Sequence, residues 1–66
     1  MSFEYTVVRV SLVGGGRAEV ELLLKGEGGL PVSERQYISF RMEAEDAKKI
    51  AVGQDAGIAL NFKAAT

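Results

Sequence analysis

The stretch FEYTVVRVSLVGGGRAEVELLLK, residues 3–25, predicts a β-hairpin, and this hairpin decides the fold. Residues 3–13 are rich in β-branched and aromatic side chains, which favour strands. Residues 17–25 alternate between apolar and polar side chains, as a strand with one buried face does. The three glycines at 14–16 adopt the positive φ of a tight turn freely, so we expect the two strands to pair antiparallel.

The two strands of this hairpin differ in their faces. In the second strand the inward face would carry Ala18, Val20, Leu22 and Leu24. In the first strand, strict alternation places Val8 and Val10 on one face and Tyr5 and Val7 on the other. Because both faces of the first strand are partly apolar, we expect it to be covered at least in part on both sides.

The middle of the chain predicts a loop and a third strand. Residues 26–35, GEGGLPVSER, hold three of the eight glycines and the only proline, so we expect an irregular segment that is either mobile or functional. Residues 36–42, QYISFRM, alternate as a strand does. Its core-facing residues would be Ile38, Phe40 and Met42, and its outward residues Tyr37, Ser39 and Arg41.

Residues 44–52 predict a helix of about two turns. Acidic residues at its start and lysines near its end suit the helix dipole, and Glu45 and Lys49 have the i,i+4 spacing of a helical ion pair. Gly53 is a typical stop after a helix. A helix this short is unstable alone in water, so we expect it to dock on the sheet and to close one open end of it.

Residues 56–63 predict the last strand. One face would carry Ile58, Leu60 and Phe62, and the other Gly57, Ala59, Asn61 and Lys63. The small side chains of Gly57 and Ala59 indicate the close approach of another layer or another chain; the alternative is that they fill space in a barrel.

The predicted order of elements is β-β-β-α-β within a single small β-rich domain, residues 1–66. We expect a mostly β fold with one short helix, built as a strongly curved antiparallel sheet or a small open barrel. The exposed edges of such a sheet invite pairing with another chain. The stretch 45–62 resembles the helix–glycine–strand corner of many small bacterial β-barrels, a resemblance that brings no functional residue with it.

The composition limits how this domain can be stabilised. A chain of 66 residues buries only about 60% of the surface that it exposes when unfolded. It has no cysteine and no histidine, which excludes disulfides, thiolate metal sites and the usual general base. With 47% hydrophobic residues, self-association is the remaining way to stabilise the core, and we expect a homo-oligomer. A monomeric mini-barrel is the alternative.

The charges are mixed along the chain, and the net charge is −1. No basic surplus marks a nucleic-acid binder. The N-terminus, MSFEYTVVRV, lacks the pattern of a signal peptide, and no run approaches the ~20 apolar residues of a membrane span. We therefore expect a cytoplasmic protein that does not engage a membrane.

The sequence offers no catalytic motif. No serine lies in a G-x-S-x-G context, and no cysteine or histidine is present to activate a nucleophile. The acidic cluster at 43–46 suits a helix N-terminus, and the glycine-rich stretches contain no phosphate-loop motif. We expect no enzyme activity, no cofactor and no metal site.

One binding hypothesis places Arg9, Tyr37 and Arg41 on one outward face of the sheet, with Tyr5 and Asn61 nearby. Arginine binds phosphate through a fork of donors and tyrosine stacks on a base, so this set would suit a small nucleotide or single-stranded nucleic acid. The alternative, which we favour, is that both arginines form ion pairs across the sheet with the outward glutamates of residues 17–25.

We interpret the sequence as a non-enzymatic, small oligomeric interaction module, such as a bacterial or phage accessory protein that engages another protein. Its candidate interface residues are Leu23, Gly57 and Ala59. One alternative function is binding of a small nucleotide or single-stranded nucleic acid. A second is a structural subunit of a larger assembly, such as a ring or a shell.

Overall fold

The structure, a computed structural model, describes residues 2–64, in which it contains four strands, one α-helix and one 3₁₀ helix. In chain order these are β1 (Ser2–Gly14), β2 (Arg17–Leu24), η1 (Val32–Glu34), β3 (Tyr37–Glu43), α1 (Ala44–Ala47) and β4 (Asp55–Ala59). The predicted β-β-β-α-β order of a mostly β fold with one short helix is confirmed.

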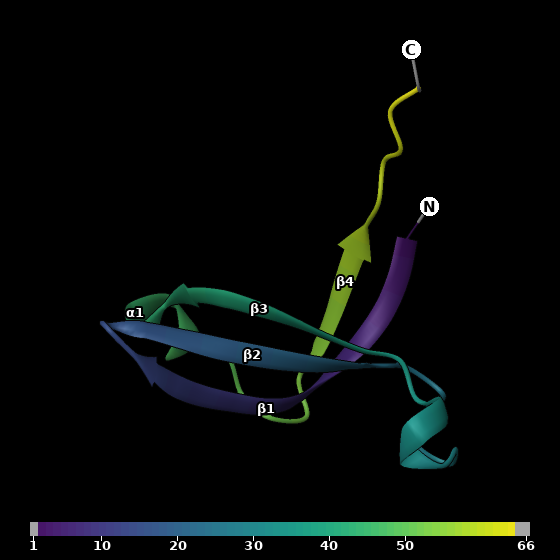
Figure 1. Ribbon diagram of the computed structural model, residues 1–66, viewed down its shortest axis with the longest axis horizontal. Coiled ribbons are helices and arrows are strands. Elements are labelled where there is room, and N and C mark those ends of the chain that lie inside the picture. The colour runs from purple at the N-terminus through teal and green to yellow at the C-terminus, as the bar shows by residue number, and fades with distance from the viewer. Residues whose placement is uncertain (1, 65–66) are drawn as a thin grey trace.

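The strands form one antiparallel sheet in the order β3-β2-β1-β4. The sheet curls strongly into a half-barrel whose two edges are β3 and β4 (Figure 1). β1 bends along its length, so that its first part pairs with β4 and its longer second part pairs with β2 (Figure 1). The predicted strongly curved antiparallel sheet is confirmed.

The β1–β2 turn explains the run of three glycines. Gly14 pairs with Arg17, which leaves Gly15 and Gly16 as the central residues of the turn. Their φ angles are +62° and +74°, and a type I′ hairpin turn needs positive φ at both central positions. Residues with a Cβ adopt this conformation at a steric cost, so the glycines determine where the hairpin reverses.

A β-bulge at Val8 interrupts the regular pairing of β1 with β2. Val7 pairs with Leu22 and Arg9 pairs with Glu21, so β1 has one residue more than β2 between these two pairs. A bulge of this kind bends the strand that carries it and increases its twist. It follows directly after Ser2–Thr6, the part of β1 that pairs with β4.

The bulge also gives β1 one apolar face in place of two. Tyr5 and Val7 contribute to the core before the bulge, and Val10 packs against the core after it. Thr6 and Val8, which alternate with Tyr5 and Val7, are half-buried, in line with the expected partial cover on both sides of β1. Side chains alternate strictly between the two faces only where each residue of the strand has one partner. The extra residue Val8 shifts this alternation by one position in the part of β1 that follows it.

The core lies on the inner face of the half-barrel. Its buried cluster consists of Tyr5, Val7, Val20 and Leu22. Partly buried residues from all four strands and from the segment after α1 pack against this cluster: Phe3, Val10, Leu24, Ile38, Met42, Ile50, Ala56 and Ile58. The predicted inward face of β2 is confirmed, as are the inward positions of Ile38 and Met42.

α1 is shorter than the sequence predicts. It ends at Ala47, whereas the apolar spacing indicates a helix over residues 44–52. Beyond Ala47, the N–H groups of Lys49 and Ile50 donate to carbonyls three residues earlier, as in a 3₁₀ helix. This tighter path brings Ile50 against the core cluster before the chain turns towards β4.

The charge pattern and the glycine stop also differ from the prediction. The ion pair of α1 joins Glu45 to Lys48 at 3.9 Å, with i,i+3 spacing, in place of the expected partner Lys49. Gly53 has the positive φ of a glycine stop, +93°. However, it lies in the turn before β4, where its N–H donates to the carbonyl of Val7 at 2.7 Å. Gly53 therefore ends the connection rather than the helix.

α1 docks on the sheet, as predicted. It packs against β2 and β3 with Ala47 buried, and the N–H of Ala44 donates to the carbonyl of Gly16 at 2.8 Å. The helix therefore covers the end of the sheet that carries the β1–β2 turn (Figure 1). Neither helix within residues 2–64 has the length and apolar character needed to cross a membrane.

β4 is also shorter than predicted, ending at Ala59 instead of residue 63. The pairing of β1 with β4 runs from Thr6↔Asp55 to Ser2↔Ala59. Ile58 packs against the core as expected, whereas Phe62 follows the strand and is exposed. The alternating pattern continues past Ala59, but a pattern alone does not show where the ladder of a strand ends.

Candidate functional site

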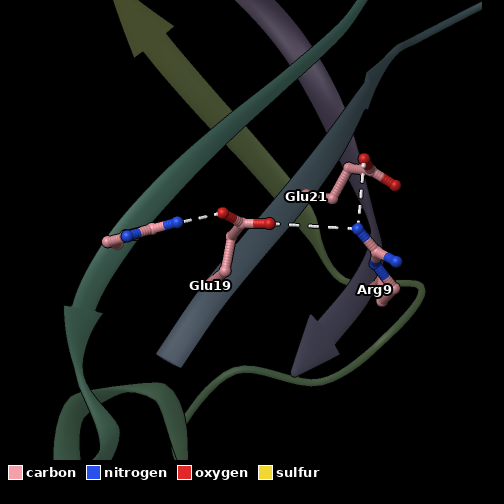
Figure 2. Close-up of polar contacts among 4 residues, drawn as sticks. Arg9, Glu19 and Glu21 are labelled. Carbon is pink, nitrogen blue, oxygen red and sulfur yellow. Dashed lines mark hydrogen bonds and ion pairs between the residues drawn. The ribbon is translucent and has the colours of Figure 1, made fainter. Parts of the chain in front are cut away.

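The outer face of the sheet carries a chain of ion pairs across three strands (Figure 2). Arg9 Nη2 lies 3.6 Å from Glu21 Oε2 and 3.9 Å from Glu19 Oε1. On its other side, Glu19 Oε2 accepts a hydrogen bond from Arg41 Nε at 3.4 Å. The register produces this arrangement, because Glu21 pairs with Arg9 and Glu19 pairs with Arg41. We name these four residues the outer ion-pair network. The favoured interpretation, that Arg9 and Arg41 form ion pairs with outward glutamates across the sheet, is confirmed.

The outer ion-pair network is balanced in charge, with two arginines and two glutamates. A phosphate group that approaches Arg9 or Arg41 competes with the carboxylate of Glu19 for the same guanidinium donors. The arginine side chains are more than half exposed, so each pair contributes only about 0.2–1 kcal/mol to stability. The network supports the register of the sheet and leaves little unpaired positive charge.

The structure does not gather the five residues of the nucleotide hypothesis into one cluster. Tyr5 is buried in the core, because β1 turns this side chain to the inner face of the sheet. Tyr37 precedes Arg41 by four residues along β3, which is about 13 Å in an extended strand. The Tyr37 hydroxyl accepts a hydrogen bond from Arg35 Nη1 at 3.3 Å. Asn61 follows β4, which lies at the opposite edge of the sheet from β3.

The glycine-rich loop between β2 and β3 is held by Arg35, a role that the sequence analysis did not identify. Arg35 Nη2 donates to the carbonyl of Gly28 at 2.9 Å, and Arg35 Nε donates to that of Leu30 at 2.8 Å. The carboxylate of Glu27 accepts the N–H of Gln36. These side chains satisfy backbone groups that lie outside the sheet, so the loop is ordered locally. The only sequence signal for this role is that a charged residue lies on each side of Gly28 and Gly29: Glu27 before them and Arg35 after them.

Lys25 connects the end of β2 to the start of β4. Its Nζ donates to Asp55 Oδ2 at 3.0 Å and lies 3.9 Å from Glu4 Oε2. The hydrogen bond to Asp55 and the charge of Asp55 raise the pKa of Lys25 above its ordinary value of 10.5. The charge of Glu4 adds to this effect, and partial desolvation opposes it. These charges make the beginning of the β4 edge polar.

The three candidate interface residues lie on the outer side of the sheet. Leu23 is half-buried and pairs with Tyr37 in the β2–β3 ladder. Gly57 and Ala59 are exposed on the edge strand β4. A Cβ added at Gly57 would meet no atom within 4 Å, so no other layer of the chain described here approaches it. The role of these residues in an interface stays a prediction.

The chain exposes more surface than a compact domain of its mass. Its accessible surface is 4972 Å², whereas a compact monomer of 7.1 kDa exposes about 4,100 Å². Its radius of gyration is 13.6 Å, compared with about 11 Å for a compact domain of this length. The difference follows from the open half-barrel and from the extended residues that follow β4 (Figure 1).

Several large apolar side chains remain exposed. In residues 2–64 they are Leu12, Val13, Leu30, Val32, Tyr37, Phe40, Val52, Leu60 and Phe62. Isolated exposed apolar residues are normal in monomers. Phe40 differs because it lies at the centre of an edge strand, shares the inner face with the half-buried Ile38 and Met42, and is still 46% exposed.

Comparison with known proteins gives no relative for this chain. The sequence matches no protein-family model, and no curated protein and no solved structure is significantly similar to it. Residues 2–64 enclose no pocket and contain no cluster of acidic side chains placed to hold a metal ion. The exposed Phe40 on an edge strand makes a surface the candidate site: the free edge of β3 and the inner face beside it.

Proposed function

We propose that this chain is a non-enzymatic interaction module of the cytoplasm that functions as a homo-oligomer. One observation carries the proposal: the surface exceeds that of a compact domain of 7.1 kDa by about 900 Å². Each partner in a standard protein–protein interface buries about 800 Å². The excess, which the open half-barrel shares with the extended residues that follow β4, is of the order of one interface per chain.

The size of the core supports the same proposal. The buried hydrophobic residues within 2–64 are Tyr5, Val7, Ala18, Val20, Leu22 and Ala47, and none of the larger side chains among them is fully buried. A domain this small is marginally stable on its own. Removing apolar surface from water contributes about 25 cal/mol per Å², so covering the inner face beside β3 would stabilise the fold.

The two alternative functions draw less support. Binding of a nucleotide or single-stranded nucleic acid would require Arg9 and Arg41 to exchange the carboxylate of Glu19 for a phosphate. A structural subunit of a ring or shell would also self-associate. It would be distinguished from a small oligomeric module by the larger number of subunits in the assembly.

The mass of the protein in solution tests the proposal. Sedimentation equilibrium over a wide range of concentrations should give a mass that rises from 7.1 kDa to a fixed small multiple of it. A mass of 7.1 kDa at every concentration would refute the proposed oligomer. A mass that keeps growing with concentration would favour the structural subunit.

Binding of single-stranded DNA tests the nucleic-acid alternative in the same samples. The proposed module should show no binding, even at low salt. Binding that weakens steeply with salt concentration, and that is lost in Arg9→Gln and Arg41→Gln, would favour the alternative function. Lys63→Gln is a suitable control, because Lys63 lies outside the outer ion-pair network.

A further inference from the structure

We propose that β3 pairs antiparallel with β3 of a second copy, centred on Phe40, so that two half-barrels share one continuous sheet. The inference rests on the proposed self-association and assigns the surface that mediates it. β3 is the longer free edge, with seven residues compared with five in β4. The β4 edge is the shorter of the two, and short edges resist pairing with another chain.

The backbone of β3 presents every second residue to the free edge. The carbonyl of Gln36 accepts the N–H of Leu24, and the N–H of Ala44 donates to the carbonyl of Gly16. Because ladder bonds alternate along an antiparallel pair, these two bonds assign the even-numbered residues of β3 to the β2 side. The odd-numbered residues have their N–H and C=O groups at the free edge: Tyr37, Ser39, Arg41 and Glu43.

A two-fold axis at Phe40 aligns these groups. Phe40 is the midpoint of Tyr37–Glu43, so pairing all seven residues places Phe40 opposite Phe40 of the second copy. Ser39 then lies opposite Arg41 of the second copy, and both have their hydrogen-bonding groups at the edge. The odd-numbered residues form the hydrogen-bonded pairs, and Phe40 forms a non-hydrogen-bonded pair, in which side chains lie closer together.

The inner faces match in this register. Phe40 meets its symmetry mate, and Ile38 meets Met42 of the second copy. All three residues already face the core side of β3, two of them packed against the core cluster. The pairing therefore joins the two cores across the former edge and covers Phe40, the most exposed of the three.

The outer faces are compatible as well. Arg41 meets Ser39 of the second copy, and its charge is already neutralised by Glu19. Tyr37 meets Glu43 of the second copy, which offers the tyrosine hydroxyl a carboxylate acceptor. No two like charges lie directly opposite each other, an arrangement that would weaken the pairing.

Ser39→Pro tests the inference without removing a bond inside one chain. The Ser39 N–H points away from β2, and proline is tolerated in an edge strand at such a position. Ala59→Pro is the matched control at the other edge. Val7 N–H donates to the Gln54 carbonyl, which assigns the even-numbered residues of β4 to β1 and leaves the Ala59 N–H pointing outward.

Sedimentation equilibrium of the two variants and the unchanged protein decides between the edges. We expect Ser39→Pro to weaken self-association by about tenfold or more, since it removes inter-chain hydrogen bonds and places a ring at the interface. Ala59→Pro should associate as the unchanged protein does. If Ser39→Pro associates normally, pairing through β3 is ruled out while the proposed oligomer stands. If the unchanged protein is monomeric, both the proposed oligomer and the pairing through β3 are ruled out.

Phe40→Cys provides a second test that does not depend on proline. The chain has no cysteine, so a single thiol reports one position. At a non-hydrogen-bonded pair on a two-fold axis, the two Cα atoms lie about 4.5 Å apart, within the range of a disulfide. Oxidation should produce a covalent dimer much faster than for Val52→Cys, an exposed position away from both edges. Equal rates for the two variants would contradict the assigned register.

Discussion

Phe40 and Val20 lie opposite each other in the β2–β3 ladder, yet Val20 is 3% exposed and Phe40 is 46% exposed. Val20 has β1 on one side and β3 on the other, whereas Phe40 has a neighbouring strand on one side only. The difference in exposure is therefore an effect of the sheet edge. It marks the place where one further strand would bury the aromatic ring.

Leu22 is central to the core, and its truncation should destabilise the fold strongly. Leu22→Ala leaves a cavity between β1 and β3, which in other proteins lowers the free energy of unfolding by about 2–5 kcal/mol. Leu12→Ala is the control, because Leu12 is exposed and should change stability by less than about 0.5 kcal/mol. Urea unfolding measures both. Equal losses in the two variants would contradict the assigned core.

Gly53 should resist substitution because of its backbone conformation. Its φ is +93°, so Gly53→Val should lower the free energy of unfolding by about 1 kcal/mol or more, although a side chain there meets open space. Gly28→Val is the matched control: Gly28 also faces open space, and its φ is not positive. Thermal melting of both variants provides the comparison. A melting temperature that is unchanged in Gly53→Val would show that the turn before β4 tolerates a side chain.

The Lys25–Asp55 contact should make stability depend on pH at the alkaline end. The folded chain raises the pKa of Lys25, so folding favours the protonated amine. The contribution of the contact is complete below the unfolded pKa of 10.5 and is lost as the pH rises through the higher folded value. The loss involves the amine of Lys25 facing the carboxylates of Asp55 and Glu4.

This dependence is measured as the difference in melting temperature between the unchanged protein and Lys25→Met. The difference should be constant near neutral pH and should decrease through the alkaline range. Lys48→Met is a control, because Lys48 lies 3.9 Å from Glu45 and has no hydrogen bond comparable to the 3.0 Å bond of Lys25. A difference that stays constant to the highest pH would mean that the Lys25 charge does not contribute.

Glu19 should contribute little to stability despite its central position in the outer ion-pair network. Glu19→Gln removes the negative charge shared by Arg9 and Arg41, and we expect a loss of less than about 1 kcal/mol, since both arginines are largely exposed. The loss should shrink in ~1 M salt, where the screening length is about 3 Å. Urea unfolding at low and high salt measures it. A loss that is large and independent of salt would identify a packing role for Glu19 instead.

The sequence predicts the β-hairpin, the strand order along the chain and the inward face of β2 because each depends on local periodicity and turn chemistry. The positive φ values of Gly15 and Gly16, for example, follow from the local chemistry of the turn. The bulge at Val8 is different, because it is defined only by the partner strand. An alternating pattern on one strand cannot contain that information.

The ends of α1 and β4 were beyond sequence analysis for a related reason. Apolar spacing favours a helix to residue 52, but the chain leaves α1 at Ala47 so that Ile50 reaches the core and Gly53 reaches Val7. Tertiary contacts of this kind outweigh the weak propensity of a short helix.

The candidate site shows the same division between local pattern and tertiary contact. The outward direction of Arg41 could be predicted from alternation along its strand, whereas that of Arg9 follows from the bulge at Val8. Their shared partner Glu19 depends on the register of two ladders. The bonds from Arg35 to the loop carbonyls depend on a loop path that no periodic pattern specifies. The free edge of β3 follows from the strand order in the sheet, which the sequence did not reveal.

Amide hydrogen exchange along β3, measured by NMR at low and high protein concentration, tests the central claim most directly. In one half-barrel, the amides of Ile38 and Phe40 point to β2, and those of Ser39 and Arg41 point to the free edge. Pairing through β3 predicts that all four are protected at high concentration and that Ser39 and Arg41 lose protection on dilution. Fast exchange of Ser39 and Arg41 at every concentration, with Ile38 and Phe40 protected throughout, would contradict it.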